Sequence, residues 1–178
     1  MKYKDELIKA MSYLADDDRV VFIGQCVRYP GHLLYTTLDH IPASRRLEFP
    51  VAEDMQMGVC IGLALTGVIP ISIYPRMDFL LIALNQLVNH LDKFEEMTCG
   101  QYIPKVIIRT MLGSIKPIYP GVQHSQDHTE ALKLMLTNVD VVKLQHAHEI
   151  LPAYEAAMKS KRSTVLVDAP VKREGYED

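Results

Sequence analysis

Apolar residues near the start of the chain recur at the spacing of an α-helix. They are Leu7, Ile8, Met11 and Leu14. Three consecutive aspartates at 16–18 end this pattern, and the stretch 20–24 that follows is rich in β-branched and aromatic residues. The order predicts a helix followed by a strand.

The rest of the chain alternates between strand-like runs and helical patterns. Strand-like runs lie at 46–50, 69–74, 105–109, 139–144 and 164–168. Helical patterns lie at about 52–66, from 80 to the Cys99-Gly100 pair, at 129–136 and at 150–159. Alternation of this kind predicts an α/β fold, a mostly parallel sheet with helices on both faces.

The expected sheet also indicates where a ligand binds. Open parallel sheets bind ligands beyond the carboxyl ends of their strands. That edge should carry Gln25 and Cys26, Glu53 at a strand-to-helix junction, the segment 74–79, and the Gly- and Pro-containing stretch 110–127. A connection of this length is usually functional or disordered, and we expect a functional loop.

Length and charge narrow the class of protein. A chain of 178 residues fits one domain, 1–178, with a frayed tail at 172–178. The net charge of −3 and the scattered Lys and Arg residues argue against nucleic acid as the partner. The first residues contain no continuous apolar core, so we expect no secretory signal, no membrane span and a cytoplasmic location.

Local motifs exclude several kinds of site. The sequence contains no G-x-G-x-x-G or G-x-x-x-x-G-K-[ST] cradle for nucleotide phosphates. The three cysteines are far apart, and neither histidine pair, 124/128 or 146/148, has a third ligand at metal-binding spacing, so no metal site is expected. Gly58, Gly62 and Gly67 are expected to allow close helix packing.

Glu53 is open to two explanations from its position alone. An acidic residue at the start of a helix is ordinarily explained by favourable interaction with the helix dipole. The alternative is a chemical role, and a wider pattern of motifs favours it. Their order is Pro50-Val51-Ala52-Glu53, Gly58 to Gly62, Tyr74 to Phe79, Asn85 to Asn89, and Gln123-His124-Ser125-Gln126.

Taken together these motifs resemble the pyrimidine-binding domain of transketolase-like thiamine diphosphate enzymes, and most closely the β subunits of 2-oxo-acid dehydrogenases. The resemblance runs from Val20 to about Ala169. It implies that the Glu53 carboxyl group hydrogen-bonds the aminopyrimidine ring of thiamine diphosphate and so promotes loss of the thiazolium proton. It further implies that Phe79, with Tyr74 and Gln25, lines the cofactor site, and that His124 acts on the substrate side.

The departures from the family pattern matter equally. The chain lacks the Gly-Asp-Gly motif with which such enzymes bind the diphosphate and its Mg²⁺, so a partner subunit carrying that motif is implied. Gln25-Cys26 stands where many relatives carry acidic residues. Gln123, Arg76 and Arg109 are candidates for substrate binding, the arginines through a carboxylate or phosphate, although structural ion pairing explains the arginines equally well.

These inferences give one main functional hypothesis and two alternatives. The main hypothesis is the pyrimidine-binding subunit of a split enzyme, a heterodimer or α2β2 heterotetramer, that cleaves a bond next to a carbonyl of a small molecule. Decarboxylation of a 2-oxo acid with transfer of the acyl or aldehyde unit is favoured over transketolase-type ketol transfer. The second alternative is a non-catalytic scaffold that keeps the same fold.

Overall fold

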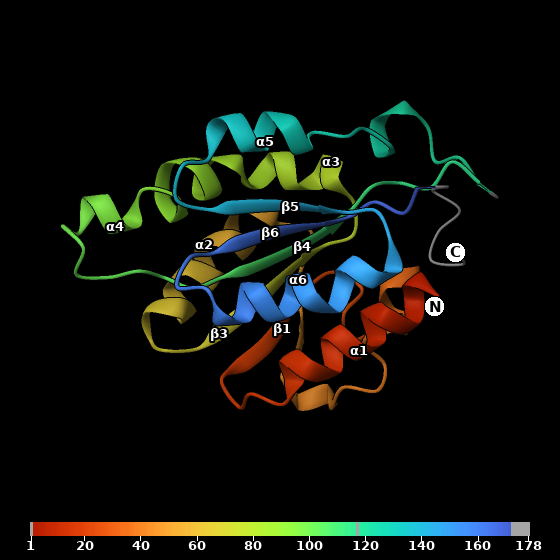
Figure 1. Cartoon of the computed structure of the whole chain (residues 1–178), viewed down its shortest axis with the longest axis horizontal. Helices are drawn as coiled ribbons and strands as arrows, with labels where there is room; N and C mark the ends of the chain where they lie inside the picture. The colour runs from red at the N-terminus through yellow and green to blue at the C-terminus, as the bar shows by residue number, and fades with distance from the viewer. Residues whose placement is uncertain (1, 117, 172–178) are drawn as a thin grey trace.

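A single parallel sheet of six strands organises the protein. The computed structural model describes residues 2–116 and 118–171 (Figure 1). The strand order is β2-β1-β3-β4-β6-β5, and every neighbouring pair is parallel. The strands are β1 (Val20–Gly24), β2 (Arg46–Glu48), β3 (Ile69–Tyr74), β4 (Ile107–Met111), β5 (Asp140–Leu144) and β6 (Thr164–Asp168). The predicted α/β fold is confirmed.

Helices cover both faces of the sheet, as the alternating pattern predicts. On one face α1 (Tyr3–Ala15) packs along α6 (Ala147–Lys159) over a core that includes Leu7, Phe22 and Ile71 (Figure 1). The other face carries α2 (Glu53–Leu65), α3 (Met77–Leu80) and α5 (Thr129–Met135) over a second core. No helix in the described ranges is long and apolar enough to cross a membrane.

The helix predicted between 80 and 99 is a chain of shorter pieces. After α3 come a 3₁₀ turn, η3 (Leu81–Ala83), a π-helical segment, η4 (Asn85–Leu91), and the short α4 (Phe94–Met97). The π segment ends with a hydrogen bond from the Asp92 backbone N–H to the Leu87 carbonyl, 2.9 Å long. Apolar spacing alone cannot distinguish such a widened turn from a regular helix, because both bury the same side of the chain.

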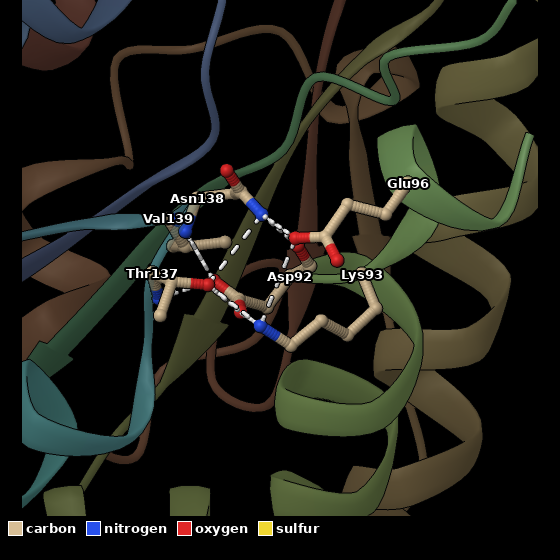
Figure 2. Close-up of polar contacts among 6 residues, drawn as sticks. All are labelled: Asp92, Lys93, Glu96, Thr137, Asn138 and Val139. Atoms are coloured by element: carbon tan, nitrogen blue, oxygen red, sulfur yellow. Dashed lines mark hydrogen bonds and ion pairs between the residues drawn. The ribbon is translucent and has the colours of Figure 1, made fainter. Parts of the chain in front are cut away.

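The Asp92 side chain, directly after η4, holds the loop 137–139 that leads into β5 (Figure 2). Its carboxylate accepts hydrogen bonds from the backbone N–H groups of Thr137, Asn138 and Val139 at 2.7 to 2.9 Å. The ammonium of Lys93 lies 3.0 Å from the same carboxylate. Asp92 is fully buried. One side chain therefore fastens the end of η4 to the start of β5.

Two boundaries differ from the predicted ones for local reasons. Strand β4 begins two residues later than expected, because the backbone before it is engaged by a side chain: the Val106 N–H donates to the Ser163 hydroxyl oxygen. Helix α6 begins three residues earlier than expected, at Ala147. The Glu149 carboxylate accepts the His146 backbone N–H, and this capping box sets the start.

Connections at the carboxyl edge include two further 3₁₀ helices, η1 (Leu33–Thr37) and η5 (Val122–His124). A third, η2 (Ala43–Arg45), lies at the opposite edge and leads directly into β2. Gly24 closes β1 at the carboxyl edge, and its backbone lies so near the Ile73 carbonyl that a Cβ atom would collide with it. The glycine lets the chain turn sharply out of the sheet. The predicted tail at 172–178 lies outside the described residues.

Candidate active site

Glu53 lies at the carboxyl edge of the sheet as the first residue of α2, and only 3% of it is exposed. Gln25, just beyond the end of β1, reaches it: Gln25 Nε2 donates a 3.1 Å hydrogen bond to Glu53 Oε1. In the described part of the chain no donor reaches Glu53 Oε2. One oxygen is thus held by the protein, and the other is left for a donor from outside the chain.

A second carboxylate shapes the turn that carries Gln25. Glu48, at the end of β2, accepts three successive backbone N–H groups, those of Cys26, Val27 and Arg28, at 2.6, 3.0 and 2.8 Å. Cys26 has a φ of 57°, the left-handed conformation that turns successive N–H groups toward a common anion. Sequence reasoning missed Glu48, because its contacts join segments about twenty residues apart.

Tyr74 does not line the open side of this edge, and this part of the sequence prediction is corrected. The residue is fully buried, and its hydroxyl donates to the backbone carbonyl of Glu53 at 3.4 Å. Burial raises the pKa of the Tyr74 hydroxyl well above its ordinary value. Ser72 and Gln56 continue the same buried polar chain. Tyr74 therefore supports the first residue of α2 through a buried contact with its backbone.

Phe79 and His124 meet at the same edge, as the motif order leads us to expect. Phe79 is half-buried in α3, and its ring meets the His124 ring edge-on, with the centroids 5.5 Å apart. His124 Nδ1 is buried and has no hydrogen-bond partner within the described residues. An unpaired buried nitrogen is costly and marks a position where a ligand or water is expected.

The loop that carries His124 is fastened on both sides. The backbone at Gly113 lies so close to the His124 carbonyl that a Cβ atom would collide with it. Further along, Gln126 Nε2 donates to Asp78 Oδ1 at 3.0 Å, and the Asp127 carboxylate pairs with Lys143 at 2.5 Å. The expected functional loop is therefore held against α3 and β5 by specific contacts.

The three candidate substrate residues are in different environments. Arg109 is fully buried in β4, where its Nε and Nη2 atoms each lie 2.9 Å from Asp168 Oδ2. The structural ion pair is the correct explanation for Arg109, since a side chain with no exposed surface cannot meet a substrate. Arg76 is half-buried just before α3, and Gln123 is exposed in η5.

The expected role of the three glycines in close helix packing is largely wrong. A Cβ atom at Gly58 would lie at ordinary contact distance from Gln86, and at Gly62 and Gly67 it would meet nothing within 4 Å. Gly62 lies on an exposed side that begins at Val51, two residues before α2, and continues along the helix through Met55 and Val59. We call these four residues the α2 face.

Across the described ranges, no three or more His, Cys, Asp or Glu residues are grouped so that they could hold a metal ion. His146 and His148 stack on each other with centroids 5.5 Å apart, at the exposed start of α6. His128 donates its backbone N–H to the Met77 sulfur at 3.3 Å.

Sequence comparison relates this arrangement to known proteins. The chain is 30% identical over 135 residues to the 3-methyl-2-oxobutanoate dehydrogenase subunit beta of Mycobacterium tuberculosis, a match covering 72% of this chain and 37% of that protein. It is 27% identical over 158 residues to the pyruvate dehydrogenase E1 component subunit beta of Cyanidium caldarium, covering 87% and 47%. The chain is a homologue of the 2-oxo-acid dehydrogenase β subunits. The resemblance inferred from the motifs is confirmed.

Structural comparison extends the relationship to transketolases at the level of the fold. A split-gene transketolase, described as an inactive beta4 tetramer, superposes with a TM-score of 0.71 at 20% identity, covering 98% of this chain and 52% of that one. Transketolase from Campylobacter jejuni gives a TM-score of 0.74 at 13% identity, covering 99% and 26%. No family model matches the chain. The chain spans less than half the length of these β-subunit homologues.

Proposed function

We propose that this chain is the pyrimidine-binding subunit of a split thiamine diphosphate enzyme that cleaves a bond next to a carbonyl. The favoured reaction is decarboxylation of a 2-oxo acid with transfer of the resulting acyl or aldehyde unit. The observation that carries the proposal is the buried Glu53 carboxylate, held at one oxygen by Gln25 on the ligand-binding edge of a β-subunit homologue.

The residues at this edge fit the aminopyrimidine half of the cofactor. Glu53 Oε2 has no donor in the described chain, so it can hold a hydrogen on the flat ring. The half-buried Phe79 offers an aromatic surface against which such a ring packs. Thiamine diphosphate, when bound, supplies a carbon nucleophile that adds to a carbonyl and stabilises the electron pair left by bond cleavage.

His124 is suited to the substrate side of the same site. Its ring contacts Phe79, and its buried Nδ1 has no partner among the described residues. An imidazole nitrogen in this setting can take part in one hydrogen bond and can pass a proton to or from a substrate oxygen. We assign His124 to proton transfer and Glu53 to holding the cofactor ring.

Two features support a partner chain that binds the diphosphate and Mg²⁺. A cluster of convergent backbone N–H groups at this edge, at residues 26–28, is already filled by Glu48 and is not available for a diphosphate. The α2 face is apolar and exposed, with Val51 at 81%, and an exposed helical glycine at Gly62 lets another backbone approach closely. A partner with a Gly-Asp-Gly motif in a heterodimer or α2β2 assembly accounts for both.

The proposal is tested by calorimetric titration of thiamine diphosphate with Mg²⁺. The titrant is added to this chain alone, to the candidate partner subunit alone, and to their mixture. We expect binding in the mixture, loss of that binding in Glu53→Ala, and retention in the matched surface variant Glu155→Ala. Tight binding to this chain alone, or no binding to the mixture, refutes the shared site and favours the scaffold alternative.

Turnover assays on the mixture then separate the two chemistries. Release of CO₂ from a 2-oxo acid supports the favoured reaction. Transfer of a two-carbon ketol unit between sugar phosphates, without CO₂, supports the transketolase-type alternative instead.

A further inference from the structure

The start of α3 and the loop that carries His124 run past each other in opposite directions. Three contacts pair consecutive residues of α3 with alternate residues of the loop: Met77 with His128, Asp78 with Gln126, and Phe79 with His124. The first joins a backbone N–H to sulfur, and the last joins two rings. The middle contact, between Asp78 and Gln126, is a hydrogen bond between two polar side chains.

The Asp78 carboxylate is committed to this loop. Asp78 is buried, with 9% of it exposed. Its Oδ1 atom accepts two hydrogen bonds from Gln126, one from the side-chain amide at 3.0 Å and a longer one from the backbone N–H at 3.4 Å. Its Oδ2 atom is buried and has no hydrogen-bond partner within the described residues. In that part of the chain, Gln126 alone supplies donors to Asp78.

A carboxylate in this setting is a poor stabiliser of the fold. Burying a charge costs free energy, which only good geometry and several hydrogen bonds offset. Here a single neutral residue supplies the donors. That residue, Gln126, is exposed, so its amide can bond to water when Asp78 is removed. A buried group that breaks the rules of a stable core is expected where it serves a site.

The places of Asp78 and Gln126 in the sequence indicate which part of the site they serve. Asp78 directly precedes Phe79, and Gln126 lies two residues after His124. Within the loop, the His124 backbone N–H donates to the Gly121 carbonyl at 3.1 Å. That bond shapes the loop but does not attach it to α3. The hydrogen bond to Asp78 attaches it, and so sets how the His124 ring lies against Phe79.

We propose that Asp78 is a positioning residue, which through Gln126 holds the His124 imidazole against Phe79 on the substrate side of the site. The inference rests on the proposed function and gives a role to a residue to which the motifs assign none. Asp78 itself touches neither cofactor nor substrate and transfers no proton. Proton transfer needs hydrogen-bond distance, and a displacement of about 1 Å lowers a rate by about 10²-fold.

NMR spectra of the whole chain, without cofactor or partner, provide the first test. The π electrons of Phe79 shift the resonances of the His124 ring protons, because the two rings are in contact. We expect Asp78→Ala to move these resonances most of the way to their positions in Phe79→Leu. Asp78→Asn, whose oxygen can still accept from Gln126, should leave them close to the wild type. Glu130→Ala removes an exposed carboxylate from α5 and should leave them unchanged.

Urea unfolding separates positioning from a purely structural role. Since the Asp78 carboxylate is a poor stabiliser, the unfolding midpoint of Asp78→Ala should equal or exceed that of the wild type. A lower midpoint with unchanged His124 resonances overturns the proposal. If Asp78→Ala does not fold, Gln126→Met removes the amide donor from the exposed side instead. It must then shift the same resonances, and their constancy in that variant overturns the proposal as well.

Turnover of the mixture with the partner subunit provides the second test. Asp78→Ala should lower kcat by about 10- to 100-fold with little change in KM or in thiamine diphosphate affinity. Asp78→Asn should restore most of that loss. Equal loss of kcat in both variants, or weaker cofactor binding at unchanged kcat, overturns the proposal. If the wild-type mixture shows no turnover, the proposed function fails, and the resonances of the lone chain still decide whether Asp78 positions His124.

Discussion

Gln25 Nε2 donates a 3.1 Å hydrogen bond to Glu53 Oε1 across the carboxyl edge of the sheet. The amide orients the carboxylate without adding charge. The Glu48 carboxylate in turn holds the turn that carries Gln25. The position of the proposed cofactor-binding oxygen therefore depends on β1, β2 and α2 together.

Replacing Glu53 with glutamine should abolish turnover while the protein still folds. The glutamine side chain has the same size as glutamate, and its oxygen can still accept the hydrogen bond from Gln25. It cannot exchange a proton with the cofactor ring. We expect turnover of the complex to fall by at least about 10²- to 10⁴-fold. Circular dichroism melting of the lone chain should change little. Near-normal turnover in Glu53→Gln would remove the central claim.

Replacing Gln25 with glutamate should make the site sensitive to pH. Two carboxyl groups at hydrogen-bond distance cannot both ionise easily, so the pair retains a proton to higher pH than either group alone. The pH profile of turnover should therefore gain a step that is absent from the wild type. Gln25→Met, which adds no charge, should weaken cofactor binding without that step. Superimposable profiles for Gln25→Glu and the wild type would contradict this account.

Breaking the Arg109–Asp168 pair should affect stability rather than substrate binding. Arg109→Met leaves a buried carboxylate without its main cation, and we expect the free energy of unfolding to fall by about 3–5 kcal/mol in urea titrations. The double variant Arg109→Met with Asp168→Leu should recover most of that loss. A stable Arg109→Met protein with a raised KM would show that the arginine serves the substrate instead.

Asp92 should be a main anchor of the loop that leads into β5. Asp92→Ala leaves three backbone N–H groups without their acceptor, two of them partly buried and one, that of Val139, buried. We therefore expect a loss of about 3 kcal/mol in the free energy of unfolding. Glu96→Ala removes an exposed carboxylate from the same cluster and should change stability by less than about 0.5 kcal/mol. Equal losses of unfolding free energy in Asp92→Ala and Glu96→Ala would contradict the anchoring role of Asp92.

The same anchor gives stability a defined pH dependence. Burial alone raises the pKa of Asp92, but hydrogen bonds from Asn138 and Thr137 and from the Lys93 ammonium outweigh it and hold the pKa below the ordinary 3.8. Its contribution is therefore fully present above pH 3.8 and is lost as the pH falls through the lower value of the folded state. Urea titrations across that range should show the loss in the wild type and a flatter dependence in Asp92→Ala.

Much of the fold was predictable because apolar spacing follows directly from burial. The strands 20–24, 69–74 and 164–168 match the structure at both ends. The break-up of the helix after 80 was not predictable, since a π turn and an α turn bury the same side chains. Helix α6 was predicted too short because its start depends on a polar side chain, Glu149, which apolar spacing does not reveal.

The residues of the candidate site were likewise predictable only in part. Motifs identified Glu53, Phe79 and His124 as candidates, and the structure places all three at the carboxyl edge of the sheet. Tyr74 was assigned to the wrong environment, since sequence does not reveal which way an aromatic at the end of a strand points. Glu48 was missed because its role arises from contacts between segments that only folding brings together.

The Glu48 contacts also tie the proposed cofactor site to the shortest strand at an edge of the sheet. β2 has three residues and pairs with β1 alone, so it should open at a smaller free energy than the central strands. When it opens, the turn at 26–28 loses its acceptor and Gln25 loses its fixed position. Heating should therefore disturb the proposed site before the core melts. The highest temperature at which the proposed site keeps its geometry would then be set by β2, a strand of three residues at the edge of the sheet.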